Sequence, residues 1–447
     1  MHKRRNRIAA VLAASVSTAL ALTACGGGGG GGGQTADGKT EVIFWQQQFE
    51  DYQQAWFKEH VDAFNKSQDE VVVKHQVVPA DTWEQKMQTA QAAGKQPDVM
   101  TSNYGDIVPG SREGRFLPLD EFLPEEAFTD IKDNVAGFVT VDGEHMAYPM
   151  LVEPSTVLYY RTDLVEAAGL DPDSPPTDWD GLIEWAEKLT DGDVKGFTIA
   201  STAPDLAWSS WGLQQNACGS FPVNDDWSEA TATDPCYAEL ANFYKTLFEE
   251  GLIPQQPKVG YADGAPYGDG EVAMMAGGSW VVGQLKNDYP DMVEKTQVAP
   301  FPSIDGDQTK TTATLGGWTL TLDAKSKNPE AAASFIEYLL AGDPEIMADF
   351  FKTSGFSKYT VRTSVDEALA SDPEASDDPF MAVISEKVVP YGEAEPAYPW
   401  DISLAMGTAI ESAMKGVTDV DSALQTANDQ INDVIKKQKL EGKAPSN

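Results

Sequence analysis

The chain alternates short apolar strands with amphipathic helices, and this alternation limits the possible folds more than any other feature. Residues 41–45 and 71–78 are the apolar, valine-rich runs typical of buried strands. Between them, bulky side chains recur at steps of three and four, as on one face of a helix: Phe49, Tyr52, Trp56, His60 and Phe64. Alternating β and α elements favour a mostly parallel sheet covered by helices. We therefore expect an α/β protein.

The first 24 residues have the pattern of an export signal. Basic residues precede an apolar segment from Ile8 to Ala24, which is short for a membrane span and runs into Gly26–Gly33. A transmembrane helix with an unpaired cysteine is the weaker alternative. Leu22-Thr-Ala-Cys25 resembles a bacterial lipobox, in which Cys25 is lipidated. The pattern predicts a signal peptide at 1–24, a Gly-rich tether at 25–40, and lipid anchoring on the extracytoplasmic face of the cell membrane.

The composition is strongly acidic and excludes nucleic acid as a partner. The chain has 70 Asp and Glu against 32 Lys and Arg, which gives a formal net charge of −38. Such a surface repels nucleic acids and anionic lipid headgroups. Since the acids are spread along the whole chain, we expect them to form a solvated surface.

Two cysteines, Cys218 and Cys236, remain if Cys25 is acylated. In an exported protein an isolated pair predicts a disulfide. A metal site would need more ligands than the sequence offers nearby, and we expect none. The three histidines beyond the signal segment lie far apart in the sequence: His60, His75 and His145.

Motifs of catalysis are missing from the sequence. It has no G-x-S-x-G elbow, no phosphate-binding P-loop and no H-E-x-x-H motif. Carboxylates are too abundant for any pair to be assigned as the acid and nucleophile of a glycosidase. We therefore expect a protein that is not an enzyme and that needs no cofactor.

Several separated segments together resemble the family 1 extracellular solute-binding proteins, the maltose-binding-protein-like receptors of ABC importers. Each is weak alone, but their order and spacing behind a lipobox are specific, and they extend over nearly all of residues 41–440. In chain order they are residues 94–99, 114–120, 143–149, 158–164, 168–172, 179–189, 270–280, 315–318 and 326–331.

This resemblance implies two α/β lobes of the periplasmic-binding-protein type, joined by a hinge of two or three crossings with ligand in the cleft between them. Crossings are expected near residues 152–155, 312–318 and 355–361. Lobe 1 would then comprise residues 41–150 and 315–355, and lobe 2 residues 151–314 and 356–447.

The ligand implied by the resemblance is a neutral saccharide, expected to be a di- or oligosaccharide. Sugars need aromatic platforms together with fixed hydrogen-bonding side chains. Trp280 and Trp400 match the stacking aromatics of the family, and Glu153 matches a hydroxyl-binding carboxylate at the first crossing. The other expected ligand-binding residues follow strands, lie at the second crossing, or adjoin Trp400: Trp45, Gln47, Gln48, Glu50, Asn103, Tyr104, Asp106, Gly317, Trp318 and Asp401.

Other ligands and functions remain open at this point. Only four arginines follow the signal segment, without a cluster, which disfavours the bidentate recognition of a phosphate. A polyamine or glycerol phosphate is the alternative solute, and a glycosidase or a structural cell-wall lipoprotein the alternative function. The resemblance implies the permease subunits of an ABC importer as partners, and we expect the protein to be a monomer.

Overall fold

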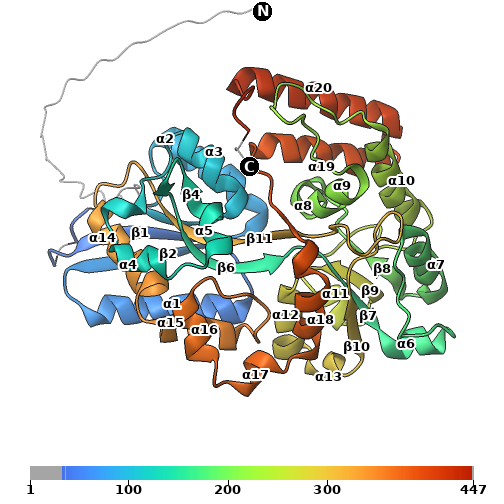
Figure 1. The fold of residues 1–447 in the computed structure, drawn as a ribbon, viewed down its shortest axis with the longest axis horizontal. Helices are drawn as coiled ribbons and strands as arrows, with labels where there is room; N and C mark the ends of the chain where they lie inside the picture. Colours follow the sequence, from blue (N-terminus) through green and yellow to red (C-terminus); the bar gives the residue numbers. More distant parts are fainter. Residues whose placement is uncertain (1–32, 36, 445–447) are drawn as a thin grey trace, which may run out of the picture.

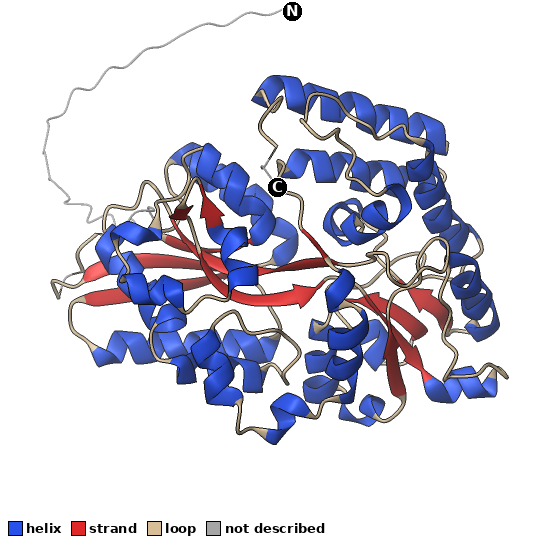
Figure 2. Cartoon of the chain, viewed as in Figure 1, coloured by secondary structure: helices blue, strands red, loops and turns tan. Residues whose placement is uncertain are grey.

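The computed structural model of the chain describes residues 33–35 and 37–444. The predicted signal peptide and Cys25 lie outside the described residues. Over the described part, the strands form two large sheets that lie beside each other, each with its own covering of helices, and a small two-stranded sheet of β4 (Thr140–Val141) and β5 (Glu144–His145) (Figures 1 and 2). The prediction of a two-lobed α/β fold is confirmed.

The first lobe is built on a six-stranded sheet with the order β12-β11-β3-β1-β2, in which β6 also pairs with β11. Its parallel pairs are β1 with β2 and with β3, and β11 with β12, whereas β11 runs antiparallel to both β3 and β6. The sheet is thus mixed rather than mostly parallel. Strands β11 and β12 run opposite to β1, β2 and β3, whereas β6, which is antiparallel to β11, runs in the same direction as those three. The strands are β1 (Thr40–Gln47), β2 (Val71–Val78), β3 (Val99–Asn103), β6 (Tyr148–Pro154), β11 (Thr314–Leu322) and β12 (Glu393–Ala394).

Helices cover both faces of this sheet, with α2 and α3 on one side and α1, α15 and α16 on the other (Figure 1). Helix α1 buries Trp56, Phe57, Val61 and Phe64, an apolar stripe that faces the core. The main helices of the lobe are α1 (Asp51–Ser67), α2 (Trp83–Ala93), α3 (Ile107–Arg112), α4 (Glu125–Thr129), α5 (Asp133–Val139), α14 (Pro329–Ile336), α15 (Pro344–Thr353) and α16 (Thr363–Leu369).

The hydrophobic core of the first lobe continues past residue 355. Phe356, Val361, Val365 and Leu369 belong to the same buried cluster as Phe44 on β1. The sequence placed residues from 356 onward in the second lobe. From this packing we propose that the first lobe extends to about Leu369.

The second lobe has a four-stranded sheet with the order β10-β7-β9-β8 and a separate buried cluster. Its strands are β7 (Val157–Arg161), β8 (Lys195–Thr198), β9 (Val272–Gly277) and β10 (Thr296–Ala299). Its helices include α6 (Thr162–Ala167), α7 (Trp179–Leu189), α8 (Ala203–Ser209), α9 (Trp211–Cys218), α10 (Pro235–Glu249), α11 (Ala265–Gly268), α12 (Trp280–Asp288), α13 (Pro290–Val293) and α18 (Pro379–Lys387).

A third buried cluster joins the last two helices, α19 (Trp400–Met414) and α20 (Val420–Gln438), to the loop between α9 and α10. A disulfide between Cys218 and Cys236 closes this loop, with the Cα atoms 5.3 Å apart. The predicted disulfide is confirmed. Figure 1 shows α19 and α20 side by side at the edge of the second lobe.

Three segments run next to each other between the lobes. Strand β6 leads into β7 through Ser155, whose N–H donates to the Thr314 carbonyl at 2.9 Å, at the start of β11. The third segment contains Tyr359, whose N–H and C=O both pair with Val152 at 2.8 and 3.0 Å. These contacts form a hinge whose segments are hydrogen-bonded to one another.

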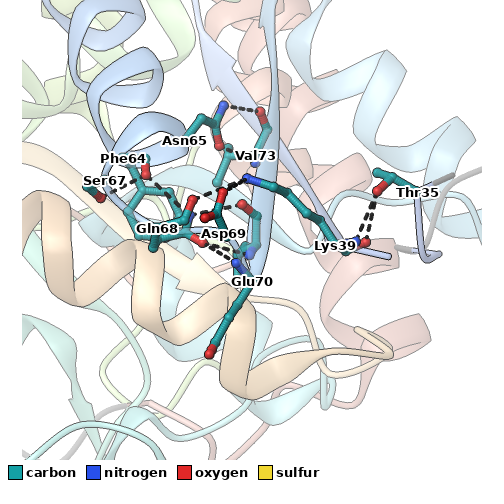
Figure 3. Close-up of polar contacts among 10 residues, drawn as sticks. Thr35, Lys39, Phe64, Asn65, Ser67, Gln68, Asp69, Glu70 and Val73 are labelled. Carbon is teal, nitrogen blue, oxygen red and sulfur yellow. Dashed lines mark hydrogen bonds and ion pairs between the residues drawn. The ribbon is translucent and has the colours of Figure 1, made fainter. Parts of the chain in front are cut away.

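The amino end of β1 is fastened to the turn that follows α1 (Figure 3). The Lys39 ammonium lies 3.2 Å from Asp69 Oδ1 and donates to the Gln68 carbonyl. The Asn65 amide pairs with both backbone groups of Val73, on the outer edge of β2, which satisfies groups that an edge strand would otherwise expose. Gly33 and Gln34 also bond to β1 near Thr40 and Glu41. From these contacts we propose that the folded part begins before the expected boundary at residue 41.

Candidate functional site

The loops that follow β3 and β9 meet at the end of β6. After β3, the Tyr104 hydroxyl donates to the Leu151 carbonyl at 3.0 Å. After β9, the Ser279 N–H donates to the Pro154 carbonyl at 3.1 Å. In α/β sheets, ligands bind outside the carboxyl ends of the strands, where such loops gather. Residues 151–155 are therefore the centre of the candidate site.

A buried ion pair lies at this centre. Lys358 Nζ is 2.6 Å from Glu153 Oε2, and the two side chains are 3% and 9% exposed. Lys358 precedes Tyr359, so the ion pair joins the third hinge segment to the first. Isolated charges are costly to bury, and each partner here compensates the other.

Further carboxyl groups surround the ion pair. Burial raises the pKa of Glu50, which follows β1; the Lys358 ammonium opposes this rise, and the Glu153 and Asp263 carboxylates add to it. These effects place acidic groups from both lobes within electrostatic range of one another. A ligand at this point would meet several oxygen acceptors held by different elements.

Glu395 links the C-terminal part of the chain to the loop after β3. Its Oε2 accepts a hydrogen bond from the Gly105 N–H at 3.0 Å. Burial raises the pKa of Glu395 to about 8; the hydrogen bond from Gly105 opposes this rise, while Asp106 and Glu153 add to it. At neutral pH this carboxyl is therefore largely protonated, and it can donate as well as accept a hydrogen bond.

Aromatic side chains line the second-lobe side of the site. The Trp280 ring lies 6.0 Å from Trp208 and 6.3 Å from Tyr261, measured between centroids. Trp280 Nε1 donates to the Ala262 carbonyl, and the Tyr261 hydroxyl donates to the Ser155 carbonyl at the hinge. Trp280 is only 6% exposed, so Trp280→Ala should lower the stability of the second lobe by about 3–5 kcal/mol.

The structure brings several of the expected binding residues to the end of β6 or close to it: Glu50, Tyr104, Glu153 and Trp280. Gly317 has φ of +155°, and a Cβ at this position would lie 2.1 Å from the Leu151 carbonyl oxygen, so a side chain would push the hinge strands apart.

The carboxyl groups of Asp106 and Asp401 both act electrostatically on Glu84, a residue of α2. Burial raises the pKa of Glu84 to about 7; Asp106 adds to the rise, Arg115 opposes it, and Asp401 adds to it. Because Asp401 is the second residue of α19, the start of α19 is within electrostatic range of the first lobe. Trp400, the first residue of the same helix, is partly buried.

The remaining expected residues lie on or directly after strands β1, β3 and β11 of the first lobe. Trp45 is buried, with the Lys86 ammonium 4.4 Å from its ring centroid, and it serves the core of the first lobe. Gln47 and Gln48 are at and just after the end of β1, and the Asn103 side chain accepts from the Asp106 N–H. The Trp318 ring lies 4.9 Å from Phe49, edge to face.

Sequence reasoning missed Lys358, Glu395, Asp263 and the aromatic pair of Trp208 and Tyr261. A lone lysine or glutamate far along the chain has no periodic or motif signal. Only the tertiary structure brings these residues to the site, Lys358 through the pairing of the hinge segments and Glu395 through its bond to Gly105.

The described residues contain no group of three or more His, Cys, Asp or Glu side chains that could hold a metal ion. Within the same part of the chain, no helix is both long and apolar enough to cross a membrane.

Comparison with known proteins identifies the class to which this fold and site belong. Residues 50–343 match the family described as bacterial extracellular solute-binding protein, and the chain belongs to this family. The chain is thus a solute-binding protein of ABC transporters, and its family and structural neighbours are binding proteins rather than enzymes.

Related proteins are identical to this chain at about a quarter of the aligned positions. A binding protein of Brucella abortus is 25% identical over 398 residues, covering 86% of this chain and 90% of the relative. The arabinooligosaccharide-binding protein of Halalkalibacterium halodurans is 24% identical over 318 residues, covering 68% and 67%. Among solved structures, an ABC transporter solute-binding protein of Thermotoga lettingae bound with α-D-tagatose has a TM-score of 0.76 at 24% identity, covering 88% of this chain and 99% of that one.

Proposed function

We propose that this protein captures a neutral di- or oligosaccharide between its two lobes and delivers it to the permease of an ABC importer. The observation that carries the proposal is the convergence of the loops after β3 and β9 on residues 151–154, next to Glu153, with Glu50 from the loop after β1 within electrostatic range of it. Hydroxyl-rich ligands with C–H faces need carboxyl groups and aromatic rings in combination. The relative named as an arabinooligosaccharide-binding protein supports a sugar as the solute.

Two groups of side chains would divide the work of recognition. Glu50, Glu153 and the neutral Glu395 would exchange hydrogen bonds with sugar hydroxyls near the hinge. Trp280 and Trp400 would offer apolar ring faces, Trp280 from the second lobe and Trp400 from the start of α19. The other expected binding residues, Gln47, Gln48, Asn103, Asp106, Trp318 and Asp401, would contribute around this centre.

A lipid anchor would keep the receptor close to a permease in the membrane. Lipidation at Cys25 would provide this, with the folded part starting at Gly33 on the side of the first lobe. A tether of about eight residues spans roughly 16 Å on average. We propose that the protein acts as a lipid-anchored monomer.

The test is a thermal-shift screen of the mature protein, without its signal peptide, against mono-, di- and oligosaccharides. A ligand at 100 times its Kd adds about 2.7 kcal/mol of folding stability, and the midpoint of unfolding should rise accordingly. Trp400→Ala should lose about 2–4 kcal/mol of binding free energy, because it removes a large ring from the site. Trp400 is preferred to the more deeply buried Trp280, since its truncation disturbs the core less.

The same screen distinguishes the other solutes. Spermidine and glycerol 3-phosphate form the non-sugar arms, and a chromogenic glycoside tests for hydrolysis. A shift with spermidine alone, or turnover of the glycoside, would reject the proposal. An unchanged midpoint in every saccharide arm would reject it as well.

A further inference from the structure

Lys358 lies at the point where the third hinge segment passes the first. Its Nζ donates to Glu153 Oε2 at 2.6 Å, between residues 205 positions apart in the sequence. The next residue, Tyr359, forms two backbone hydrogen bonds with Val152, which immediately precedes Glu153. Backbone and side-chain contacts together therefore hold the ammonium group against one carboxylate oxygen.

Carboxyl groups from three different elements interact at and next to this ion pair. Glu153, on β6, bonds to Lys358 directly, and Glu50, the residue before α1, interacts with Lys358 electrostatically. Asp263, in the loop before α11, acts in turn on Glu50. Lys358 favours the ionised form of Glu50, against burial and against the charges of Glu153 and Asp263. Removing the ammonium would leave Glu153 as a buried charge beside other acids, a costly arrangement.

The hydrogen bond uses one of the two oxygens of Glu153. Among the described hydrogen bonds, Oε2 accepts from Lys358 and Oε1 accepts none. A carboxylate has acceptor capacity on both oxygens, and a hydrogen bond with a charged partner is directional. With Oε2 held by the lysine, the orientation of Oε1 is determined too.

We propose that Lys358 is a positioning residue of the solute site, which acts through Glu153 by holding Oε2 so that Oε1 accepts from a hydroxyl of the bound saccharide. This inference rests on the proposed function and adds a specific residue to it. Lys358 itself need not touch the sugar. Its contribution to affinity should therefore depend on the presence of the Glu153 carboxylate.

A double-mutant cycle measures this dependence. The wild type, Lys358→Met, Glu153→Gln and the double variant are titrated calorimetrically with the saccharide that gives the largest thermal shift. Lys358→Met should weaken binding about 10-fold or more, the loss expected for a hydrogen bond that involves a charged group. In the Glu153→Gln background the same change should have little further effect, less than about 2-fold. Lys358→Arg keeps the cation and should recover most of the affinity.

Lys286→Met is the matched control. Lys286 also forms an ion pair, with Asp378, and donates to the Gly355 carbonyl, but it lies outside the proposed solute site. Its removal should leave saccharide affinity unchanged. An equal loss of affinity in the control would indicate that ion pairs between these segments act by supporting the fold.

The outcomes separate this inference from the proposed function. Absence of binding by the wild type rejects the proposed function, and the role of Lys358 with it. Binding by the wild type with unchanged affinity in Lys358→Met rejects the role of Lys358 alone. An equal loss in both Glu153 backgrounds also rejects it, since the lysine would then act independently of the carboxylate.

Lys358→Met could prevent folding, because it leaves Glu153 unpaired. The double variant removes both charges and avoids this cost. It is then compared with Glu153→Gln alone. Equal affinities support the inference, and a further loss in the double variant overturns it.

Discussion

At the scale of single residues, the carboxyl group of Glu395 has a pKa well above the ordinary value of a glutamate. Burial, with added repulsion from Asp106 and Glu153, raises its pKa from 4.5 to about 8. The folded state therefore binds more protons than the unfolded state between these two pKa values. The contribution of Glu395 to stability should fall as pH rises through this window, and it should be constant above about pH 8.

Glu395→Gln should remove this part of the pH dependence, because the amide stays neutral and keeps an acceptor for the Gly105 N–H. Urea unfolding of both proteins at a series of pH values between about 5 and 9 measures the difference. Glu393→Gln, at an exposed position two residues earlier, is the control. If wild type and Glu395→Gln lose stability equally as pH rises, the Glu395 carboxyl is not protonated in the folded protein.

At the scale of secondary-structure elements, the disulfide between α9 and α10 links two helices that pack beside α19. Cys218 is the last residue of α9 and Cys236 the second of α10, so the bridge closes the loop between them. Closing a loop with a sequence separation of 18 restricts the unfolded chain and contributes about 3 kcal/mol.

The double variant Cys218→Ser with Cys236→Ser should lose stability by about this 3 kcal/mol, measured by urea unfolding without reductant. Adding reductant should lower the stability of the wild type toward that of the variant and leave the variant unchanged. Equal stability of the wild type and the variant in the absence of reductant would show that the disulfide adds no net stability.

At the scale of the whole molecule, the proposed site draws on both lobes. Glu50 and Tyr104 belong to the first lobe and Trp280 to the second, with the hinge segments between them. A ligand that contacts both sides binds a closed arrangement better than an open one, and this difference in affinity drives closure. Saccharide binding should therefore make the protein more compact.

Small-angle X-ray scattering at saturating saccharide should give a smaller radius of gyration than the free protein. A sugar that produces no thermal shift serves as the control and should leave the value unchanged. The same radius of gyration with and without the bound ligand would mean that binding does not close the lobes.

Much of the fold could be predicted from local sequence pattern. The strand at residues 71–78 and the helix marked by Tyr52, Trp56, His60 and Phe64 were both readable from the local side-chain pattern, and the structure has them as β2 and α1. Cys218 and Cys236 were predictable as a disulfide because exported proteins oxidise isolated cysteine pairs, and the structure confirms it. These features depend on side chains near each other in sequence, or on composition alone.

The composition of the site depended on contacts across long sequence separations. Glu153 was foreseeable from its family segment, but its partner Lys358 is 205 positions away and carries no motif. Likewise Glu395 reaches Gly105 across 290 positions. By itself, the sequence determined the elements, the α/β class and the solute-binding family, because periodicity and motif order are local properties. Only the tertiary structure decided which charges meet at the hinge, because burial and ion pairing depend on how distant strands are brought side by side.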